Sequence, residues 1–448
     1  MQVQQRSPRA ARLVFVVLLT LAALVVAACG SDDDSGGGGG GGGGKKVTLS
    51  MLVGQQETAR LEAEAKKEIE RFNEEHPNIE VKRESMDNDQ LRTVVKTRLG
   101  SDQAPDVFGY DTGPGFGGVL AKSNLVAPID DAYAKYKWNI YPWAKARATY
   151  GGKTYAVPTQ VEEVGIYYNK DIFSKLGAQP PKTVDELMAI ADKAKAQKLI
   201  PLAYGDRDQW PASHQFSMTV SNLLGREGLD EILYGDGRWN DPKVVRGIDL
   251  FFREFQDKGY FPKGANGIEY EDANALFFAG KAAMLPTGTW LVSQITQQAP
   301  FEVGFFPFPS IDGSKVAPPA GVGGGWFVAE RSKKKAAVHE FLDWQLSKDT
   351  ASNQVEVFNA IPAFPLDTSG LKVSPLFKQV LDDMAKSQED ESAFGYNIDV
   401  LTPANFNEVM SSGFQDVLNG SRTAKQQADR LQAAWAKAEK AGDTLEKP

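Results

Sequence analysis

Strand patterns and helix patterns alternate along the chain from residue 47 onward. Residues 47–53 (VTLSMLV) form a short apolar run typical of a buried strand. Residues 57–75 repeat apolar side chains every third or fourth position, which indicates a helix. Residues 79–81, 90–99 and 104–108 continue as strand, helix and strand. Strands separated by helices favour parallel pairing with crossover helices, so the sequence predicts an α/β fold.

The same alternation begins again after residue 158. Residues 165–169 (GIYYN) indicate a strand, and Thr183 and Glu186 form a capping-box pattern at the start of a helix. Residues 199–204 (LIPLAY) indicate the next strand. Further helices are predicted at 242–259, 271–280, 332–346 and from Thr423, and a further strand at 324–329. The restart predicts two α/β lobes.

The N-terminal segment has the layout of a bacterial export signal. Arg6, Arg9 and Arg12 precede an apolar run over 13–28 that is shorter than the ~20 residues a membrane-spanning helix needs. The end of this run, Val-Ala-Ala before Cys29, resembles a lipobox, in which the cysteine sulfur carries lipid. We therefore predict a signal peptide over 1–28 and an acylated Cys29. Nine consecutive glycines follow, so 29–46 is predicted to be a linker, and the body to lie outside the cytoplasm on the cell membrane.

Composition narrows the classes of function. Cys29 is the only cysteine, so no internal disulfide can form. Residues 1–28 contain three arginines and no acid, so their removal changes the net charge from −8 to −11. An acidic body of this kind argues against a nucleic-acid partner. Its length is too great for a single hydrophobic core, which agrees with two lobes, and we expect a monomer.

No pattern in the sequence indicates catalysis, a metal or a cofactor. The three histidines, His76, His214 and His339, have neither a metal-ligand spacing nor a triad arrangement. A glycoside hydrolase needs two facing carboxylates, but 58 acidic residues make some such pair inevitable. The glycine-rich loop 113–118 lacks the Lys-Ser/Thr of a phosphate-binding loop, and Pro114 removes a backbone donor. We therefore predict a protein that is not an enzyme.

Six short segments, taken in order, carry a family resemblance. The chain resembles the family 1 extracellular solute-binding proteins, which are receptors of bacterial ABC importers, and is similar to the maltose-binding protein group. The resemblance extends over 47–441. The segments are 104–108 (APDVF), 152–158 (GKTYAVP), 165–173 (GIYYNKDIF), 277–284 (FFAGKAAM) closed by 288–290 (GTW), 323–326 (GGGW) and 360–363 (AIPA).

The resemblance implies a type II periplasmic-binding-protein-like fold with two discontinuous lobes joined by a hinge. The first lobe would comprise 47–157 and 327–362, and the second 159–325 and 363–448. Ligand would lie in the cleft between the lobes and favour their closure. The implied function is capture of a mono- or oligosaccharide and its delivery to the permease of an ABC transporter.

The resemblance and the chemistry of sugars together indicate binding residues. Aromatic rings cover the apolar faces of a sugar, and carboxylates and amides bind its hydroxyls. Groups of both kinds follow predicted strands or lie at family positions, and the glycines before Trp326 allow close backbone approach. The candidates are Gln55, Gln56, Tyr110, Asp111, Glu162, Trp210, Trp290, Gly325 and Trp326.

Other interpretations stay open at this point. A tryptophan is more often a core residue than a ligand contact, and a loop carboxylate is often only solvated. Related two-lobed receptors bind iron or polyamines, and a carbohydrate hydrolase is the remaining alternative. Tyr167 and Tyr168 are adjacent in a strand and should face opposite sides, which disfavours a joint iron site.

Overall fold

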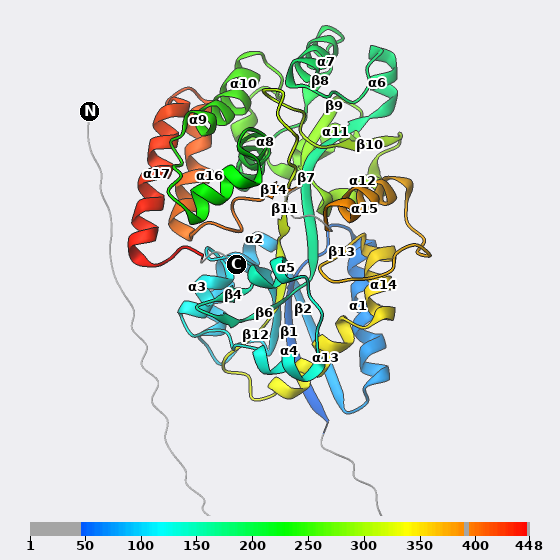
Figure 1. Cartoon of the computed structure of the whole chain (residues 1–448). Coiled ribbons are helices and arrows are strands. Elements are labelled where there is room, and N and C mark those ends of the chain that lie inside the picture. Colours follow the sequence, from blue (N-terminus) through cyan, green and yellow to red (C-terminus); the bar gives the residue numbers. More distant parts are fainter. Residues whose placement is uncertain (1–45, 389–393, 446–448) are drawn as a thin grey trace, which may run out of the picture. The chain divides into compact units, whose positions relative to one another are not determined.

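The computed structural model of the chain describes residues 46–388 and 394–445 (Figure 1). Within this part, two main β-sheets are flanked by helices. The predicted signal peptide, Cys29 and nearly all of the glycine linker lie outside the described residues. Among the described helices, none combines the length and the apolar character needed to cross a membrane.

The first sheet has the strand order β2-β1-β3-β12-β6. Its strands are β1 (Val47–Gly54), β2 (Ile79–Met86), β3 (Val107–Asp111), β6 (Ala156–Pro158) and β12 (Gly324–Val328). Strand β1 pairs in parallel with β2 and β3, which confirms the predicted crossover pattern. Strand β12 is antiparallel to β3, with Gly324 opposite Asp111. The start of β12 therefore meets the carboxyl ends of β1 and β3 at one edge of the sheet.

The second sheet is organised around the long strand β7. The strand order is β14-β11-β7-β9-β8, and β10 and β13 also pair with β7. Its strands are β7 (Gln160–Asn169), β8 (Ile200–Leu202), β9 (Ala282–Gly288), β10 (Val303–Phe306), β11 (Pro319–Val322), β13 (Ile361–Pro362) and β14 (Gly395–Tyr396). Adjacent Tyr167 and Tyr168 belong to different hydrophobic clusters, as expected for opposite faces of a strand.

The helices packed around the first sheet begin at well-capped positions. The Thr58 hydroxyl accepts a hydrogen bond from the Leu61 N–H, and the Asp87 carboxylate caps the next helix. A small two-stranded sheet, β4 (Thr149–Tyr150) with β5 (Lys153–Thr154), lies among them. The helices are α1 (Ala59–Glu75), α2 (Asn88–Leu99), α3 (Gly117–Lys122), α4 (Asp130–Tyr136), α5 (Pro142–Ala146), α13 (Lys335–Gln345) and α14 (Lys348–Phe358).

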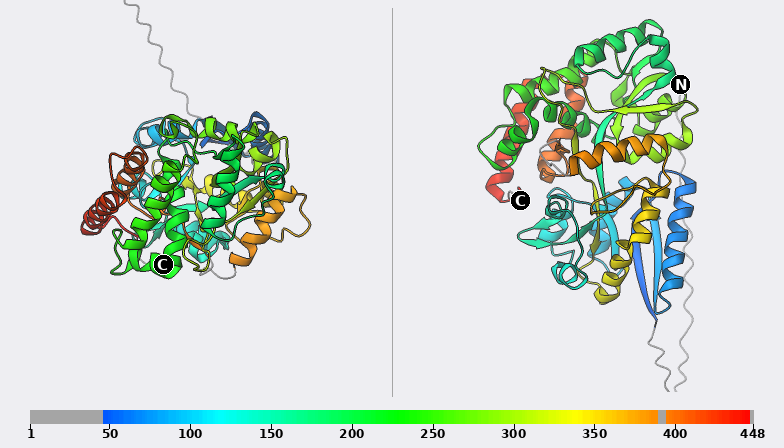
Figure 2. Two further views of the ribbon diagram at one scale, coloured as in Figure 1. Left: turned by 90° about the horizontal axis from the view of Figure 1, so that it is seen from above. Right: turned by 45° about the vertical axis from the view of Figure 1, so that its right-hand side comes forward.

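The remaining helices follow or flank the strands of the second sheet. At Thr183 only half of the predicted capping box forms, because the Glu186 carboxylate accepts from the Lys182 N–H instead. The predicted helix over 242–259 contains a π-helical turn (Asp249–Glu254). Helices α16 and α17 pack against α8 and α9 (Figure 2). The helices are α6 (Lys170–Leu176), α7 (Val184–Ala196), α8 (Trp210–Tyr234), α9 (Pro242–Ile248), α10 (Phe255–Asp257), α11 (Tyr270–Phe278), α12 (Val292–Gln298), α15 (Pro375–Gln388), α16 (Ala404–Leu418) and α17 (Ala424–Ala441), with short 3₁₀ turns at Ala265–Gly267 and Thr289–Leu291.

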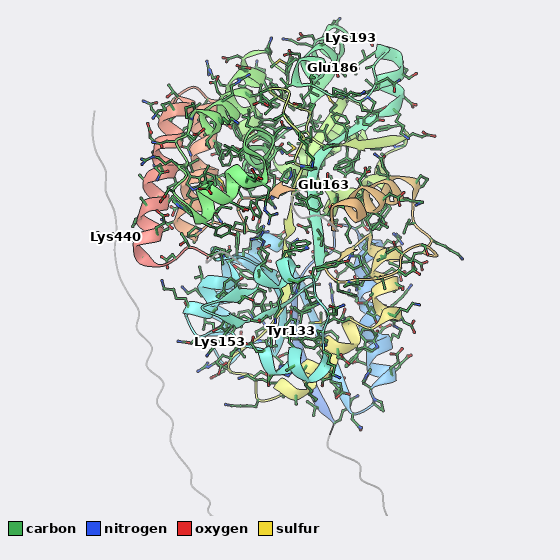
Figure 3. The ribbon with its side chains drawn as sticks, in the orientation of Figure 1. Tyr133, Lys153, Glu163, Glu186, Lys193 and Lys440 are labelled. Carbon is green, nitrogen blue, oxygen red and sulfur yellow. The ribbon has the colours of Figure 1, made fainter. Side chains whose placement is uncertain are left out.

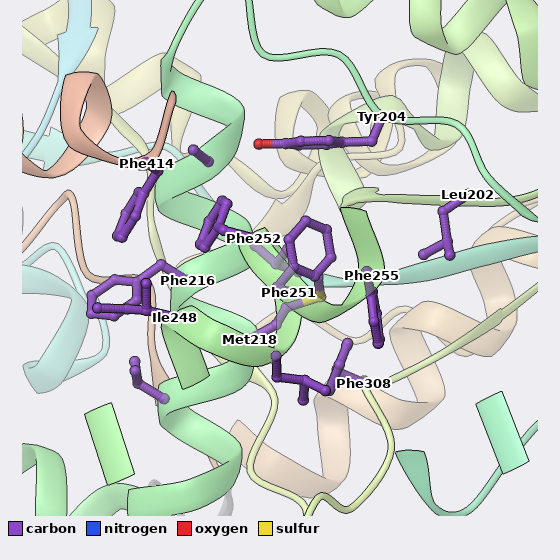
Figure 4. Close-up of a cluster of buried hydrophobic side chains, with 14 of the residues drawn as sticks. Leu202, Tyr204, Phe216, Met218, Ile248, Phe251, Phe252, Phe255, Phe308 and Phe414 are labelled. Carbon is purple, nitrogen blue, oxygen red and sulfur yellow. The ribbon is translucent and has the colours of Figure 1, made fainter. Parts of the chain in front are cut away.

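The core beside the second sheet is rich in aromatic side chains. Figure 4 shows part of it, with Phe216 from α8, Phe252 from the π-helical turn and Phe414 from α16. The rings of Phe252 and Phe414 stack with centroids 4.3 Å apart. Trp239 and Trp435 are fully buried in the same cluster. Buried aromatic area of this kind contributes strongly to the stability of a lobe.

The chain passes between the two sheets at three places. Strand β6 leads into β7 near Thr159, β11 leads into β12 near Gly323, and α14 leads into β13 near Asn359. This arrangement agrees with two discontinuous lobes joined by a hinge. The lobe boundaries given above stay a prediction.

The glycine-rich loop 113–118 packs against the segment 400–404. A side chain at Gly113 would place its Cβ 2.1 Å from the Val400 carbonyl oxygen, and one at Gly115 would meet the Thr402 carbonyl oxygen at 2.7 Å. The missing side chains therefore allow two backbones to approach closely. Nearby in the sequence, Lys122 at the end of α3 forms an ion pair with Asp443, which follows α17. The loop thus has a packing role.

Candidate ligand-binding cavity

A cavity of about 350 Å³ lies where elements of the two sheets meet. Residues at the carboxyl ends of β1 and β3 line it, together with residues from the ends of β6 and β12. Trp290, which follows β9 of the second sheet, and residues 358–362 around β13 complete the wall. A volume of this size, near the lower end of the ~300–1,000 Å³ typical of ligand pockets, suits a small organic molecule.

The loop after β1 brings two glutamines to the cavity. The Gln55 N–H donates to the Met86 carbonyl oxygen over 2.7 Å, and the Gln56 N–H donates to the Glu62 carboxylate over 3.2 Å. These bonds hold the loop backbone, while no side-chain hydrogen bond is formed by either glutamine among the described residues. Both amides are therefore available to polar groups of a ligand.

Trp290 lines the cavity from the side of the second sheet. Its indole N–H donates to the Tyr270 hydroxyl over 3.0 Å, and that hydroxyl lies 2.8 Å from the Thr287 hydroxyl. The polar edge of the indole is thus satisfied within the protein. Trp210 packs against Tyr270 with centroids 4.5 Å apart, and His214 lies 4.8 Å from Trp290. These four rings form one aromatic group.

The three glycines before Trp326 serve different purposes. A Cβ at Gly323 would lie 2.2 Å from the Glu162 carboxylate, so this glycine makes room for an acidic side chain. A Cβ at Gly325 would crowd Ala156, Val157 and Thr112, so Gly325 allows close packing of neighbouring strands. Trp326 lines the cavity and packs edge-on against Phe341, with centroids 6.3 Å apart.

Two arginines in the cavity wall are bound by carboxylates. Arg92 donates to the two Asp111 oxygens over 2.7 and 3.1 Å and to Asp89 over 3.1 Å. Arg83 donates to both oxygens of Glu62, one of them at 3.0 Å, in a pair whose side chains are only 6% and 10% exposed. Burial raises the pKa of Glu62, but hydrogen bonds from Arg83, Ser85 and the Gln56 N–H outweigh it and lower the pKa to about 2.

Glu162 lies beside the cavity on β7. Its carboxylate accepts a hydrogen bond from Gln160, a cavity residue, over 2.8 Å. Burial raises the pKa of Glu162 to about 7, and the charges of Asp111 and Asp399 add to this effect against the opposing influence of Gln160 and His214. The neighbouring Glu163, labelled in Figure 3, is buried, and burial together with Asp383 raises its pKa to about 8.

The raised pKa of Glu162 predicts a specific pH dependence of stability. Between its ordinary pKa of 4.5 and its folded pKa of about 7, the folded chain binds this proton more tightly than the unfolded chain does. The contribution of Glu162 to the free energy of unfolding therefore falls as pH rises from about 4.5 to about 7.

We expect Glu162→Gln to raise the free energy of unfolding by about 1–2 kcal/mol at pH 8, after allowance for the partial exposure of the side chain. At pH 4.5 the variant and the parent should differ much less, because Glu162 is then uncharged in the folded chain and only half ionised in the unfolded chain. Urea unfolding at the two pH values measures the difference. An equal effect at both would contradict the assigned titration.

The structure brings most of the sequence-predicted residues together. Seven line the cavity: Gln55, Gln56, Tyr110, Asp111, Trp290, Gly325 and Trp326. Glu162 contacts a cavity residue, and the ring centroid of Trp210 lies 6.3 Å from that of Trp290. Their role in binding a ligand stays a prediction.

Sequence reasoning missed several residues of this region. Arg92 and Glu57 line the cavity, and His214 lies beside Trp290 and 3.6 Å from Asp399. Glu57 directly follows the two predicted glutamines, so its position in that loop was an available signal. The sequence held no such signal for Arg92 and His214, because each lies on a helix and contacts its partners only in the tertiary fold. Among the described residues, no cluster of His, Cys, Asp or Glu suits a metal ion.

Comparison with known proteins gives a family match over residues 55–352, to the family described as bacterial extracellular solute-binding protein. The multiple sugar-binding protein of Streptococcus mutans is 28% identical over 346 residues, which cover 74% of this chain and 78% of that protein. The maltotriose-binding protein of Pyrococcus abyssi is 27% identical over 60% of this chain and 56% of its own length. An uncharacterised ABC transporter extracellular-binding protein of Pyrococcus horikoshii is 29% identical over 49% of this chain. The match spans about half the length of that last relative (51%).

Solved structures share the fold. A chitin oligosaccharide binding protein superposes with a TM-score of 0.76 at 23% identity, covering 88% of this chain and 99% of that one. An ABC transporter solute-binding protein from Thermotoga lettingae bound with α-D-tagatose gives 0.73 at 20% identity, covering 88% and 99%. This likeness confirms the predicted two-lobed α/β fold class.

Proposed function

Because the chain belongs to the bacterial extracellular solute-binding protein family, we propose that it binds a carbohydrate in the cavity between its lobes and delivers it to an ABC transporter. The names of its relatives, which include sugar-binding and maltotriose-binding proteins, support a sugar as the ligand. The partner would be the permease of the transporter, and the ATPase would be a further chain.

The composition of the cavity wall is the observation that carries this proposal. Three aromatic side chains, those of Trp290, Trp326 and Tyr110, line the cavity. The amides of Gln55 and Gln56 and the carboxylate of Asp111 lie on the same wall. A sugar ring has apolar faces and a rim of hydroxyls, so it requires these two kinds of group side by side.

We also propose that the protein is a lipoprotein held on the outer face of the cell membrane by lipid on Cys29. The basic and apolar segment before this cysteine and the glycine run after it support the proposal. If it is right, a Cys29→Ser variant expressed in a bacterial host loses incorporated labelled fatty acid. Equal labelling of the variant would exclude acylation at this residue.

A receptor and an enzyme differ in what happens to the ligand. We propose that the protein is a receptor without catalytic activity, acting through closure around its ligand. The first alternative is a receptor for a non-sugar solute such as iron or a polyamine, and the second is a hydrolase, since carboxylates line the same wall.

The purified body should therefore be stabilised against heat by at least one of a panel of mono- and oligosaccharides, and each sugar should be recovered unchanged. Thermal unfolding with and without sugar measures binding, and chromatography of the sugar measures turnover. Iron and polyamines are included in the panel as the other solute classes. Release of a shorter sugar would indicate a hydrolase. Stabilisation by iron or a polyamine, and by no sugar, would indicate that the ligand is not a carbohydrate.

A further inference from the structure

Both arginines that line the cavity are already neutralised by protein carboxylates. Arg92 is held by Asp111 through two hydrogen bonds and by Asp89 through a third. Arg83 is held by both oxygens of Glu62 in a buried pair. Among the residues that line the cavity, all within the described part of the chain, there is no lysine, no histidine and no third arginine. A negatively charged ligand would thus find no free cation on this wall.

Two further carboxylates, Glu57 and Glu68, line the cavity and form no ion pair within the described part of the chain. Glu57 keeps an exposed surface, yet the protein atoms around its carboxylate displace water, and this desolvation, with the charges of Glu271 and then Glu162, raises the pKa of Glu57 to about 7. The carboxylate of Glu68, deeper in the cavity, is held by the side-chain amides of Asn353, Gln354 and Gln345. Above pH 7, which is about the pKa of Glu57, its carboxylate is mostly ionised and adds negative charge to the wall.

At the start of helix α1, protein groups already occupy part of the backbone N–H donors. Helix N-termini bind anions through free backbone N–H groups. Here the Leu61 N–H donates to the Thr58 hydroxyl over 3.2 Å. Immediately before the helix, the Gln56 N–H donates to Glu62, so the loop amide is also occupied by a carboxylate.

We propose that the carboxylate-bound arginines, together with Glu57, make this cavity selective for uncharged sugars and exclude sugars that carry carboxylate, sulfate or phosphate groups. The inference rests on the proposed function and refines it, because it names the chemical class within carbohydrates. A hydroxymethyl group can donate to the wall carboxylates, whereas a carboxylate at the same position meets like charge. Charge, as well as shape, therefore sets the specificity.

Matched sugar pairs test the inference. Glucose and galactose are compared with glucuronate and galacturonate, and cellobiose and maltose with their phosphorylated or oxidised counterparts, by calorimetry at pH 7.5. We expect the neutral member of at least one pair to bind at least tenfold more tightly. Equal or tighter binding of the acidic members would overturn the inference and leave the proposed function standing. If no sugar of either kind binds, the proposed function fails and this inference fails with it.

Two variants connect the selectivity to named residues. Asp111→Asn removes one carboxylate from Arg92, and Glu57→Gln removes a charge without disturbing an arginine. Each should lower the ratio of neutral to acidic binding at least threefold. Glu84→Gln is the matched control. Glu84 accepts two hydrogen bonds, of 2.6 and 2.9 Å, from Arg98, which lies on helix α2 as Arg92 does. Neither Glu84 nor Arg98 lines the cavity. An unchanged ratio in both test variants, with circular dichroism showing intact folding, would contradict the role of these charges.

Discussion

Replacing Trp290 with alanine is expected to weaken sugar binding at least tenfold, which corresponds to a loss of about 1.4 kcal/mol of binding free energy. The substitution removes the aromatic ring with which Trp290 lines the cavity. It also removes the indole N–H that donates to the Tyr270 hydroxyl, although that hydroxyl keeps Thr287 as a neighbour. The loss should fall on binding, because the ring is only partly buried.

Calorimetric titration of the parent and of Trp290→Ala with the same sugar measures the effect. Trp138→Ala is a matched control, since Trp138 is also partly buried and donates its indole N–H to a side chain, that of Asp343, over 2.9 Å. Trp138 does not line the cavity. Unchanged affinity in the folded Trp290 variant would remove this residue from the site, and an equal loss in both variants would indicate an indirect effect.

Replacing Arg83 with methionine is expected to lower the free energy of unfolding by about 3–5 kcal/mol at pH 7, because the variant leaves the carboxylate of Glu62 buried without its cation. This pair is among the most buried ion pairs of the described chain. Since Glu62 also holds the Gln56 N–H, the loop that carries Gln55 and Gln56 should lose order, and affinity for sugar should fall as well.

Urea unfolding measures the first effect, and two further variants test its cause. Glu62→Gln combined with Arg83→Met removes both charges and should recover most of the lost stability. Arg98→Met breaks the more exposed pair with Glu84 and should cost about 0–1 kcal/mol. If the double variant were as unstable as Arg83→Met alone, lost packing rather than an unpaired charge would be the cause.

Local patterns were sufficient to predict the elements of the first sheet. The strand at 47–53, the helix up to residue 75 and the parallel order of the strands follow from apolar runs and periodic faces. The predicted ends of the strands and helices were less accurate. The strand predicted over 104–108 is β3 (Val107–Asp111), because a strand end depends on pairing with β12 and not on its own residues.

Helix α8 shows the limit of periodicity. Its residues from Pro211 to Leu223 are buried on every side, so its sequence has no alternation of polar and apolar faces. Ser213, Ser217 and Ser221 read locally as loop formers, yet within the fold each finds a hydrogen-bond partner. The helix is therefore specified by tertiary packing and was not predicted.

Some residues of the candidate site could also be predicted from local patterns, and others could not. Residues at strand ends, such as Tyr110 and Asp111, could be predicted because parallel strands bring their carboxyl ends to one edge. The pairing of Asp111 with Arg92 could not be predicted, because no local pattern relates a side chain on a helix to one on a strand 19 residues later. The charge balance of the cavity depends on such pairs, so charge selectivity becomes visible only in the fold.

The three passages of the chain between the sheets, near Thr159, Gly323 and Asn359, have a mechanical consequence. Three chain crossings between two bodies restrict their separation and sliding more than one crossing would, and they leave bending at the crossings as the motion of a hinge. We therefore expect ligand to enter and leave through bending at these three crossings. A protease that cuts one of the three crossings leaves two others intact, so we expect the nicked protein to keep both halves of its cavity wall together.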